Sequence, residues 1–362
     1  MPICLCYLYI TKGGFYPLHV KTYMNITLFV NLFEEDLNGI CHGVPNATYQ
    51  KFTMNSLGFR GKEIDFEKKE GGIRIVCFGG SETFGFFENQ DKEWPFQLEE
   101  MLRDKFPTAE VINASVVGLR VKKRKDYVAK YVLPLKPDIM IIFHQRFLEY
   151  VKDSIRGVDE KGLASKIRGE RVKNPAVDPT TVSAKRAHSK IVDVLIRCLP
   201  EGLLTQHRLW KLRRRIRRKE EKYLIHKEPM NEVPDNIVFE YERNLTGFVH
   251  YLKENHIVPV LSTFPALVTP FNKDTYKDLL LATRLLFCIE LSENGILNAI
   301  RQLNHVIRRI AKEENLILID NEDLIPKTRE YFGDNFHYTD KGAEFLARNV
   351  CDILNHSSSI KC

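Results

Sequence analysis

The chain has 362 residues, of which 44% are hydrophobic and 28% are charged, the balance of an ordinary globular protein, which excludes wholesale disorder. The formal net charge is +7, from 54 Lys and Arg against 47 Asp and Glu. That excess is too small to indicate nucleic-acid binding by itself, so we expect no nucleic-acid partner. No run of 18 or more apolar residues occurs, so no transmembrane segment is predicted.

The N-terminus and the cysteines bear on location. Residues 2–10 are apolar but lack a basic n-region and a small-residue cleavage site, which makes them a poor signal peptide. The eight cysteines include no C-x-x-C pair, so neither a zinc ribbon nor a redox motif is predicted. A reducing compartment fits best, although an even number of cysteines leaves disulfides open. We therefore favour a cytoplasmic location, and the oligomeric state stays unknown.

Strand-like and helix-like segments alternate after an N-terminal extension, residues 1–70, which is not expected to have a core of its own. Compact apolar runs predict strands buried on both faces, and 3.6-residue spacing predicts the helices between them. This alternation implies a mainly parallel sheet with helices on both faces. The predicted strands are residues 73–78, 110–113, 138–143, 258–264 and 316–320, and the predicted helices are residues 94–106, 121–135, 236–255, 297–313 and 340–354, the last with Thr339 as N-cap.

The alternation of strands and helices is interrupted at residues 150–235. We interpret this segment as a helical cap or flap inserted between the two parts of the α/β domain, residues 71–149 and 236–357. The insertion ends in a basic run, RLWKLRRRIRRKEEK, at residues 208–222. Such a run is more often a solvated helix face balanced by nearby acids, here Glu220 and Glu221. The other interpretation is a surface that binds an anionic polymer or a membrane.

A Gly-rich segment, FGGSETFG, follows the first predicted strand and precedes a helix. Ligands of open parallel sheets bind outside the carboxyl ends of the strands, so Ser81 would face that crevice. The start of the next helix would offer N–H groups and a positive dipole end to a developing anion. The segment lacks the Lys and the spacing of a P-loop. By itself it is also compatible with a simple turn.

Near the other end of the domain, GDNFHYTDKG places Asp334 three residues before His337. A carboxylate that accepts the Nδ1–H of a histidine fixes its tautomer, so that Nε2 can take a proton from a serine. Taken alone, a D-x-x-H segment is as compatible with a helix cap on the surface as with catalysis.

The two segments together resemble the SGNH/GDSL hydrolase family, with Ser81 matching the nucleophile and Asp334 and His337 matching its triad partners. Gly80 stands where an Asp usually precedes the serine. NASVVGLR resembles the second block, with Gly118 at its oxyanion glycine, and NSLGFRGKE, residues 55–63, resembles the lead-in of many bacterial members. The resemblance implies a flavodoxin-like three-layer α/β/α sandwich of about five parallel strands, carrying the helical insertion, and needs no cofactor and no metal.

One block departs from the family pattern. The third block supplies an Asn side chain as an oxyanion donor, but Phe147 occupies that position here, and Phe cannot donate. Gln145 is the preferred substitute, and His144 and Arg146 are alternatives. The backbone N–H groups of Ser81 and Gly118 are the other expected donors. Loss of one donor typically costs about 10²–10³ in turnover, so the departure leaves both a weakened enzyme and a degenerate member open.

The sequence thus predicts a serine esterase that forms an acyl-enzyme, with a small-molecule or carbohydrate ester as substrate. The resemblance favours O-acetyl groups of a carbohydrate. An O-acyltransferase with the same chemistry is a close variant. The rival hypothesis is a non-catalytic SGNH-fold binding protein, and a third is an anion-binding scaffold built on the basic insertion.

Overall fold

A computed structural model describes residues 31–143, 145–157, 201–224 and 227–357. The described residues divide into two compact units. The first unit lies within Met1–Arg146, Phe239–Leu267 and Gln302–Cys362, and the second lies within Phe147–Val238 and Val268–Arg301. The second unit thus contains residues 268–301, which the sequence analysis assigned to the α/β domain. The apolar segment at residues 2–10 and the candidate donor His144 lie outside the described residues.

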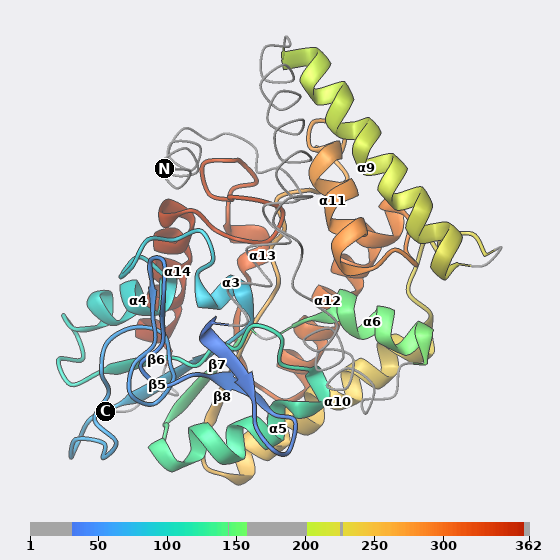
Figure 1. The fold of residues 1–362 in the computed structure, drawn as a ribbon. Helices are drawn as coiled ribbons and strands as arrows, with labels where there is room; N and C mark the ends of the chain where they lie inside the picture. The colour runs from blue at the N-terminus through green and yellow to red at the C-terminus, as the bar shows by residue number, and fades with distance from the viewer. Residues whose placement is uncertain (1–30, 144, 158–200, 225–226, 358–362) are drawn as a thin grey trace. The chain divides into compact units, whose positions relative to one another are not determined.

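The first unit is built on a five-stranded parallel sheet (Figure 1). In chain order the strands are numbered 1 to 5, and their spatial order is 2-1-3-4-5, the order of flavodoxin-like sheets. The predicted fold class is confirmed, and each predicted strand is found with its ends within two residues. The strands are β5 (Arg74–Phe78), β6 (Glu110–Asn113), β7 (Ile139–Ile142), β8 (Val258–Ser262) and β9 (Ile317–Ile319).

Helices cover both faces of this sheet. On one face α4 packs against α14 and β6. On the other face the ring of Phe78, the last residue of β5, packs against the rings of Tyr127 and Phe248. Successive side chains of a strand point to opposite faces, so β5 contributes to the packing on both faces of the sheet. The helices concerned are α4 (Trp94–Leu102), α5 (Arg124–Tyr127), α10 (Asp235–Glu254), α12 (Glu293–Glu313) and α14 (Asp340–His356).

The helix predicted at residues 121–135 is a composite. It begins with η1 (Val121–Lys123), continues through α5 and a π-turn, η2 (Val128–Val132), and ends in η3 (Leu133–Leu135). Pro134 lies in the last turn, where its missing N–H removes a helical hydrogen bond. Lys136 then takes a left-handed conformation with φ of 52° before the next strand. The apolar spacing therefore predicts the position of this segment correctly but not its regularity.

Residues 31–70 form two small antiparallel sheets on the first unit, β1 (Phe33–Glu35) with β2 (Cys41–Gly43), and β3 (Thr48–Tyr49) with β4 (Phe52–Thr53). The rings of Phe33 and Phe52 pack on Phe84, just after β5. This part of the extension thus completes the core of the α/β unit. Gly43 and Gly58 approach so closely that a Cβ on either would lie about 2 Å from the other's carbonyl oxygen, which excludes larger residues.

The second unit is helical in its described part. It contains α6 (Phe147–Arg156), α9 (Glu201–Tyr223) and α11 (Lys277–Phe287), together with the first turns of α10 and α12. The helix α9 packs along α11, with Leu212 and Ile216 buried. Arg284 of α11 is also buried and forms an ion pair with Glu220 of α9 at 2.6 Å. No helix of the described residues combines the length and apolarity needed to cross a membrane.

Candidate active site

The turn that carries Ser81 is set by two glycines. The strand β5 ends at Phe78, Gly79 and Gly80 follow, and Ser81 begins the short helix α3 (Ser81–Phe84). A Cβ on Gly79 would lie 1.9 Å from Oγ1 of Thr83, so only glycine fits there. The Gly80 N–H donates to the carboxylate of Glu82 at 2.7 Å. The turn therefore presents Ser81 at the carboxyl end of the sheet.

Ser81 and His337 meet although they lie far apart in the sequence. The Oγ of Ser81 lies 2.7 Å from Nε2 of His337. The Nδ1 of His337 lies 2.9 Å from each carboxylate oxygen of Asp334. A carboxylate only accepts hydrogen bonds, so it fixes the tautomer with the proton on Nδ1 and leaves the Nε2 lone pair facing the serine hydroxyl. The three side chains have the geometry of a nucleophile, its base and an orienting acid.

The loop that carries Asp334 and His337 is itself rigidly held. Oδ1 of Asp334 accepts the backbone N–H groups of Phe336 at 2.9 Å and His337 at 3.0 Å. The N–H of Gly333 donates to the carbonyl of His337 at 2.8 Å. Immediately afterwards, Thr339 caps α14 by accepting the N–H of Gly342, as predicted. A spacing of three residues brings the Asp334 carboxylate to the His337 ring because the backbone N–H groups of the same turn donate to that carboxylate and fix its position.

The loop after β6 is tied to the Ser81 turn. The N–H of Val116 donates to the carbonyl of Gly79 at 2.9 Å, and Nδ2 of Asn113 donates to the carbonyl of Thr83 at 3.2 Å. Gly118, in the same loop, has φ of 100°, a conformation that is costly for residues with a side chain. Neither Ser81 nor Gly118 shows a protein acceptor for its N–H among the described residues.

Gln145 is not placed as the sequence analysis expected of an oxyanion donor. Its amide nitrogen donates to the carbonyl of Ser262 at 3.1 Å and lies 3.5 Å from that of Ile142, and its Oε1 accepts the hydroxyl of Tyr241 at 3.0 Å. Its exposed fraction is 1%. A planar amide with both ends engaged in a buried network has no proton left for a substrate. We therefore correct this assignment and leave Gln145 out of the site.

The other candidates after β7 differ from one another. Arg146 has φ of 43°, an unusual backbone conformation for a residue with a side chain. Phe147 is buried and begins α6, so the position that supplies an Asn in the resembled family carries no polar side chain here. Among the described residues after β7, no polar side chain therefore takes the place of that Asn.

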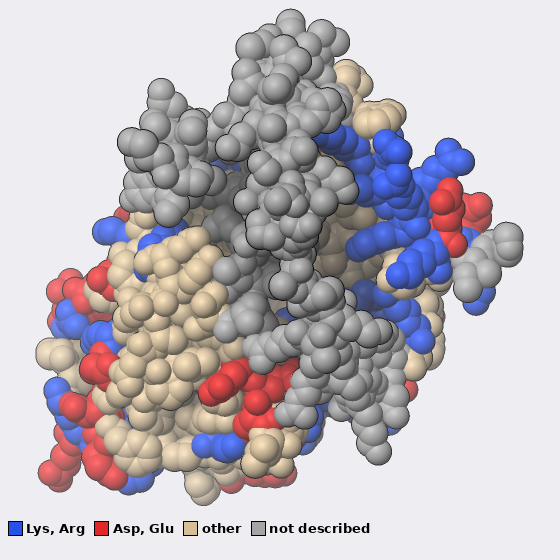
Figure 2. Space-filling view, in the orientation of Figure 1, with Lys and Arg blue, Asp and Glu red and all other residues tan. Residues whose placement is uncertain are grey.

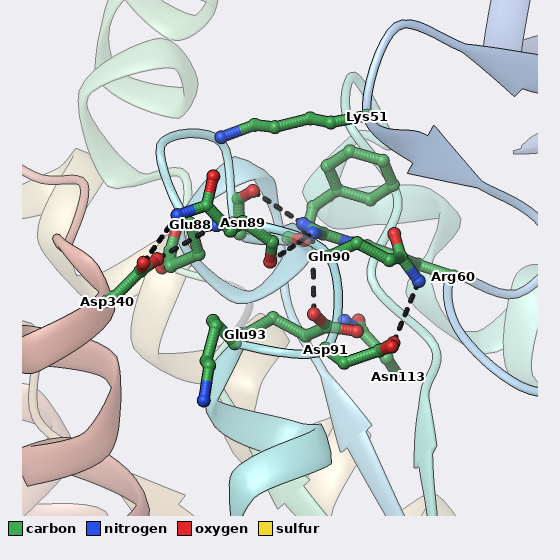
Figure 3. A network of polar contacts seen from close by, with 12 residues as sticks. Lys51, Arg60, Glu88, Asn89, Gln90, Asp91, Glu93, Asn113 and Asp340 are labelled. Carbon is green, nitrogen blue, oxygen red and sulfur yellow. Dashed lines mark hydrogen bonds and ion pairs between the residues drawn. The ribbon is translucent and has the colours of Figure 1, made fainter. Parts of the chain in front are cut away.

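Sequence reasoning missed Arg60 (Figure 3). Its side chain is fully buried, and its guanidinium donates to the carbonyls of Phe84 and Gly85, the residues that end α3. It also donates to the carbonyl of Asn89 at 3.2 Å and pairs with Glu93 at 3.3 Å. Arg60 belongs to NSLGFRGKE, the segment that resembles the lead-in of many bacterial members of the family. That resemblance marks the segment but assigns no role to the arginine.

A short loop after α3 supports the imidazole. The rings of Phe86 and Phe87 lie 5.4 Å and 5.8 Å from the ring of His337. Lys51 donates to the carbonyl of Phe87 at 2.6 Å, and Asp340, at the start of α14, accepts from the backbone and side chain of Asn89 at 2.8 Å and 2.6 Å (Figure 3). Arg60, Lys51 and Asp340 thus hold this loop from three separate segments.

Two ionisable groups of this loop region are perturbed by burial. Burial raises the pKa of Glu88 to about 8 and lowers the pKa of Lys51 to about 8. Glu88 is 1% exposed, and one of its oxygens has no hydrogen-bond partner among the described residues. Desolvation disfavours the charged form of each group. Burial of this loop beside His337 therefore favours the neutral form of the Glu88 carboxyl group.

The described residues contain no cluster of three or more His, Cys, Asp or Glu side chains that could hold a metal ion. Four described cysteines, Cys41, Cys77, Cys288 and Cys351, are buried free thiols. Burial raises the pKa of Cys41 to about 12, so this thiol is a poor nucleophile at neutral pH. Ser81, by contrast, has its Oγ 2.7 Å from the Nε2 of His337.

Comparison with known proteins gives matches to solved structures. No family model matches the chain, and no curated protein matches it either. It is similar to a structure described as a lipolytic protein of the G-D-S-L family from Desulfitobacterium hafniense, at 14% identity and a TM-score of 0.42, over 78% of this chain and 100% of that one. It is also similar to the lipase/acylhydrolase from Enterococcus faecalis, at 15% identity and a TM-score of 0.42, over 77% and 94%.

A third structure is a catalytic mutant of an acetylxylan esterase from Geobacillus stearothermophilus, at 15% identity and a TM-score of 0.41, over 78% of this chain and 94% of that one. At these identities and scores the similarity assigns no activity to the chain.

Proposed function

We propose that this chain is a serine ester hydrolase of the SGNH/GDSL type. The observation that carries the proposal is the chain of contacts from Ser81 Oγ through the imidazole of His337 to the carboxylate of Asp334, at 2.7 Å and 2.9 Å. His337 is 4% exposed. A buried histidine held between a serine hydroxyl and a carboxylate is the arrangement that activates a serine by general-base catalysis, and a helix cap would need neither the serine contact nor the burial.

In the first step the Ser81 hydroxyl attacks the ester carbonyl carbon while His337 Nε2 takes its proton. The new Oγ–C bond forms a tetrahedral intermediate, and the carbonyl oxygen becomes an oxyanion. The N–H groups of Ser81 and Gly118 donate to it. Asp334 stabilises the imidazolium that forms. The imidazolium then gives its proton to the departing alkoxide, so the C–O ester bond breaks, the alcohol leaves and an acyl-enzyme remains.

In the second step water takes the place of the alcohol. His337 removes a proton from the water, whose oxygen attacks the acyl carbon. The second tetrahedral intermediate collapses, the Oγ–C bond breaks, and the proton returns from His337 to Ser81. The products are a carboxylic acid and the free enzyme. No cofactor or metal takes part in these steps.

For the substrate we propose an O-acetyl ester of a carbohydrate. This choice rests on the sequence resemblance of residues 55–63 and of the blocks around Ser81, Gly118 and His337. Because only two backbone donors are assigned, we expect turnover of simple esters to be about 10²–10³ below that of an enzyme with a third donor. The first assay should therefore be sensitive to slow turnover.

The test is hydrolysis of p-nitrophenyl acetate by the wild type and by Ser81→Ala, each checked for folding by circular dichroism. A fluorophosphonate probe is added as a second readout, because it labels an activated serine even when turnover is slow. We expect hydrolysis above the uncatalysed rate and one labelled site in the wild type, and neither in Ser81→Ala. A folded wild type that neither hydrolyses nor takes the label would refute the proposal and favour a binding protein.

If the probe labels Ser81 but p-nitrophenol is released only with a sugar acceptor present, and the acetyl group is then found on the sugar, the enzyme is an acyltransferase. Release of acetate from acetylated xylan, compared with xylan deacetylated by alkali, tests the carbohydrate substrate separately. Hydrolysis of p-nitrophenyl acetate without release from any acetylated polysaccharide would leave the esterase standing and remove the carbohydrate substrate.

A further inference from the structure

One side chain of the N-terminal extension reaches the loop that carries Gly118. The Sγ of Cys41, in β2, lies 3.6 Å from the carbonyl oxygen of Val117 and donates to it. That carbonyl and the N–H of Gly118 belong to one peptide group, because residue 118 follows residue 117. The thiol therefore contacts the same peptide whose N–H we expect to donate to the oxyanion.

This peptide lies at the centre of a β-turn, residues 116–119. The N–H of Leu119 closes the turn by donating to the carbonyl of Val116 at 3.5 Å. Gly118, the third residue, has φ of 100°, whereas the φ of Val117 is not positive. A positive φ at the third residue alone defines a type II turn, and a type I turn has about −90° there. The two types differ in the direction of the central peptide, so the turn type decides where the Gly118 N–H points.

The local sequence does not choose between the two turn types. Glycine takes positive and negative φ about equally well, so Gly118 permits either. The described residues contain no cis peptide bond, and in a trans peptide the C=O and N–H point in opposite directions. A donor that fixes the carbonyl of Val117 thus fixes the N–H of Gly118 as well. Cys41 supplies that donor from 76 positions away in the sequence.

The side chain of Cys41 stays in its donating form. A thiol donates only while it keeps its proton. Cys41 is 3% exposed, and burial raises its pKa to about 12, with Glu35 adding to the shift and Arg146 opposing it. Glu35 is the partner of Cys41 in β1, and Figure 2 shows acidic side chains exposed over this hairpin. At neutral pH the side chain is therefore a neutral thiol that donates to the carbonyl.

The hairpin that carries Cys41 is itself held on the first unit. Asp36, in the turn between β1 and β2, accepts from Nζ of Lys130 at 2.6 Å and from the hydroxyl of Tyr131 at 3.1 Å. The ring of His42, next to Cys41, stacks on the ring of Tyr131 with the centroids 4.9 Å apart. These contacts lie on both sides of Cys41 along the chain. They give the thiol a fixed position from which to hold the turn.

We propose that Cys41 is a positioning residue of the oxyanion site, whose thiol holds the Val117–Gly118 peptide so that the Gly118 N–H faces the oxyanion. The proposal rests on the proposed function, in which that N–H donates to the oxyanion. The start of the same turn is bonded to the Ser81 turn, because the N–H of Val116 donates to the carbonyl of Gly79. Cys41 acts through the peptide and takes no part in the chemical steps.

Two variants of nearly equal shape test the hydrogen bond. Threonine and valine both suit a strand, but only threonine donates. With p-nitrophenyl acetate we expect Cys41→Val to lower kcat about 10-fold at unchanged KM, less than the about 10²–10³ of a donor lost outright. Cys41→Thr should keep most of the wild-type kcat. Cys351→Val removes another buried thiol, on α14, and should leave kcat unchanged. Thermal melting of each variant reports stability.

A second measurement does not depend on turnover. Protein labelled with ¹⁵N-glycine gives an amide signal for each glycine, and the signal of Gly118 is identified by its loss in Gly118→Ala. We expect this signal to move in Cys41→Val and to stay at its wild-type position in Cys41→Thr. The reason is that the N–H changes direction only when the carbonyl of Val117 loses its donor.

Two outcomes would overturn the proposal. A wild-type kcat and an unmoved Gly118 signal in Cys41→Val would mean that the thiol does not hold the peptide. Equal losses of kcat in Cys41→Val and Cys41→Thr would mean that the packing of the thiol supports the site and its hydrogen bond does not. A wild type without esterase activity would refute the proposed function, and the Gly118 signal would still decide whether Cys41 holds the peptide.

Discussion

The guanidinium of Arg60 donates to the carbonyl of Gly85, at 2.5 Å, and so holds the end of the short helix that Ser81 begins. Gly85 has φ of 84°, and a Cβ there would lie 2.5 Å from the same guanidinium. The guanidinium thus donates to the last carbonyls of α3, which in a longer helix would accept the N–H groups of the next turn. This contact links residues 31–70 to the nucleophile and predicts a positioning role for Arg60.

We expect Arg60→Met to lower kcat about 10–100-fold with little change in KM, because Arg60 touches the Ser81 helix and not the substrate. The variant also leaves the buried carboxylate of Glu93 unpaired, which costs about 3–5 kcal/mol of stability. The double variant R60M/E93Q removes that carboxylate charge and should regain much of the stability. If positioning is the role, kcat stays low in the double variant. Recovery of both stability and kcat would show that Arg60 acts on folding alone.

Asp334→Asn should lower kcat about 10⁴-fold while stability changes little. The amide would favour the wrong tautomer of His337, yet its oxygen can still accept the backbone N–H groups of Phe336 and His337. Steady-state kinetics and thermal melting measure the two effects separately. Asp352→Asn, at an exposed position of α14, is the matched control and should leave both unchanged. An Asp334→Asn enzyme with full kcat would contradict the assigned triad.

Gln145→Leu should reduce stability and not the chemistry of the folded enzyme. It removes the amide donor to the carbonyl of Ser262 and one of the two acceptors of the Tyr241 hydroxyl, at a cost of about 1–3 kcal/mol. We expect kcat to stay within tenfold of the wild type when measured below the melting temperature. Tyr241→Phe disturbs the same network from its other end and should behave alike. A kcat loss of about 10²–10³ in Gln145→Leu alone would restore Gln145 to the oxyanion site.

Glu88 predicts a pH dependence of stability. Its pKa is raised from 4.5 to about 8, so the folded state holds a proton that the unfolded state releases between these values. The contribution of Glu88 to the free energy of unfolding is therefore present below pH 4.5 and is lost as the pH rises to 8, by about 1.4 kcal/mol per pH unit. Glu88→Gln should remove this loss.

Urea unfolding of the wild type and of Glu88→Gln at pH 5 and pH 8 measures this change in the free energy of unfolding. The stability of Glu88→Gln relative to the wild type should rise by several kcal/mol between the two pH values, whereas the exposed control Glu70→Gln should show no such trend. If Glu88→Gln and the wild type keep a constant difference, Glu88 is ionised throughout this range in the folded protein.

Local sequence patterns predicted the sheet well because its strands are short and buried on both faces. Each strand has a short apolar core, and such runs can be recognised from the sequence without knowledge of their neighbours in the sheet. The helices α6 and α11 escaped prediction. For α11 the reason is visible, because buried Thr283 and Arg284 break its apolar spacing, and only the contacts with α9 and residues 289–291 make that burial favourable.

The sequence by itself determined the residue types of the site: a serine between glycines after a strand, an Asp and a His three apart before a helix, and a glycine that can take a positive φ. These signals are local, since each depends on a few neighbours. The tertiary structure alone decided that Ser81 meets His337 across 256 positions, that Gln145 is engaged with Ser262 and Tyr241, and that Arg60 holds the end of α3. Parallel strands bring their carboxyl ends to one edge of the sheet, so contacts between distant residues form there, and no spacing along the chain records them.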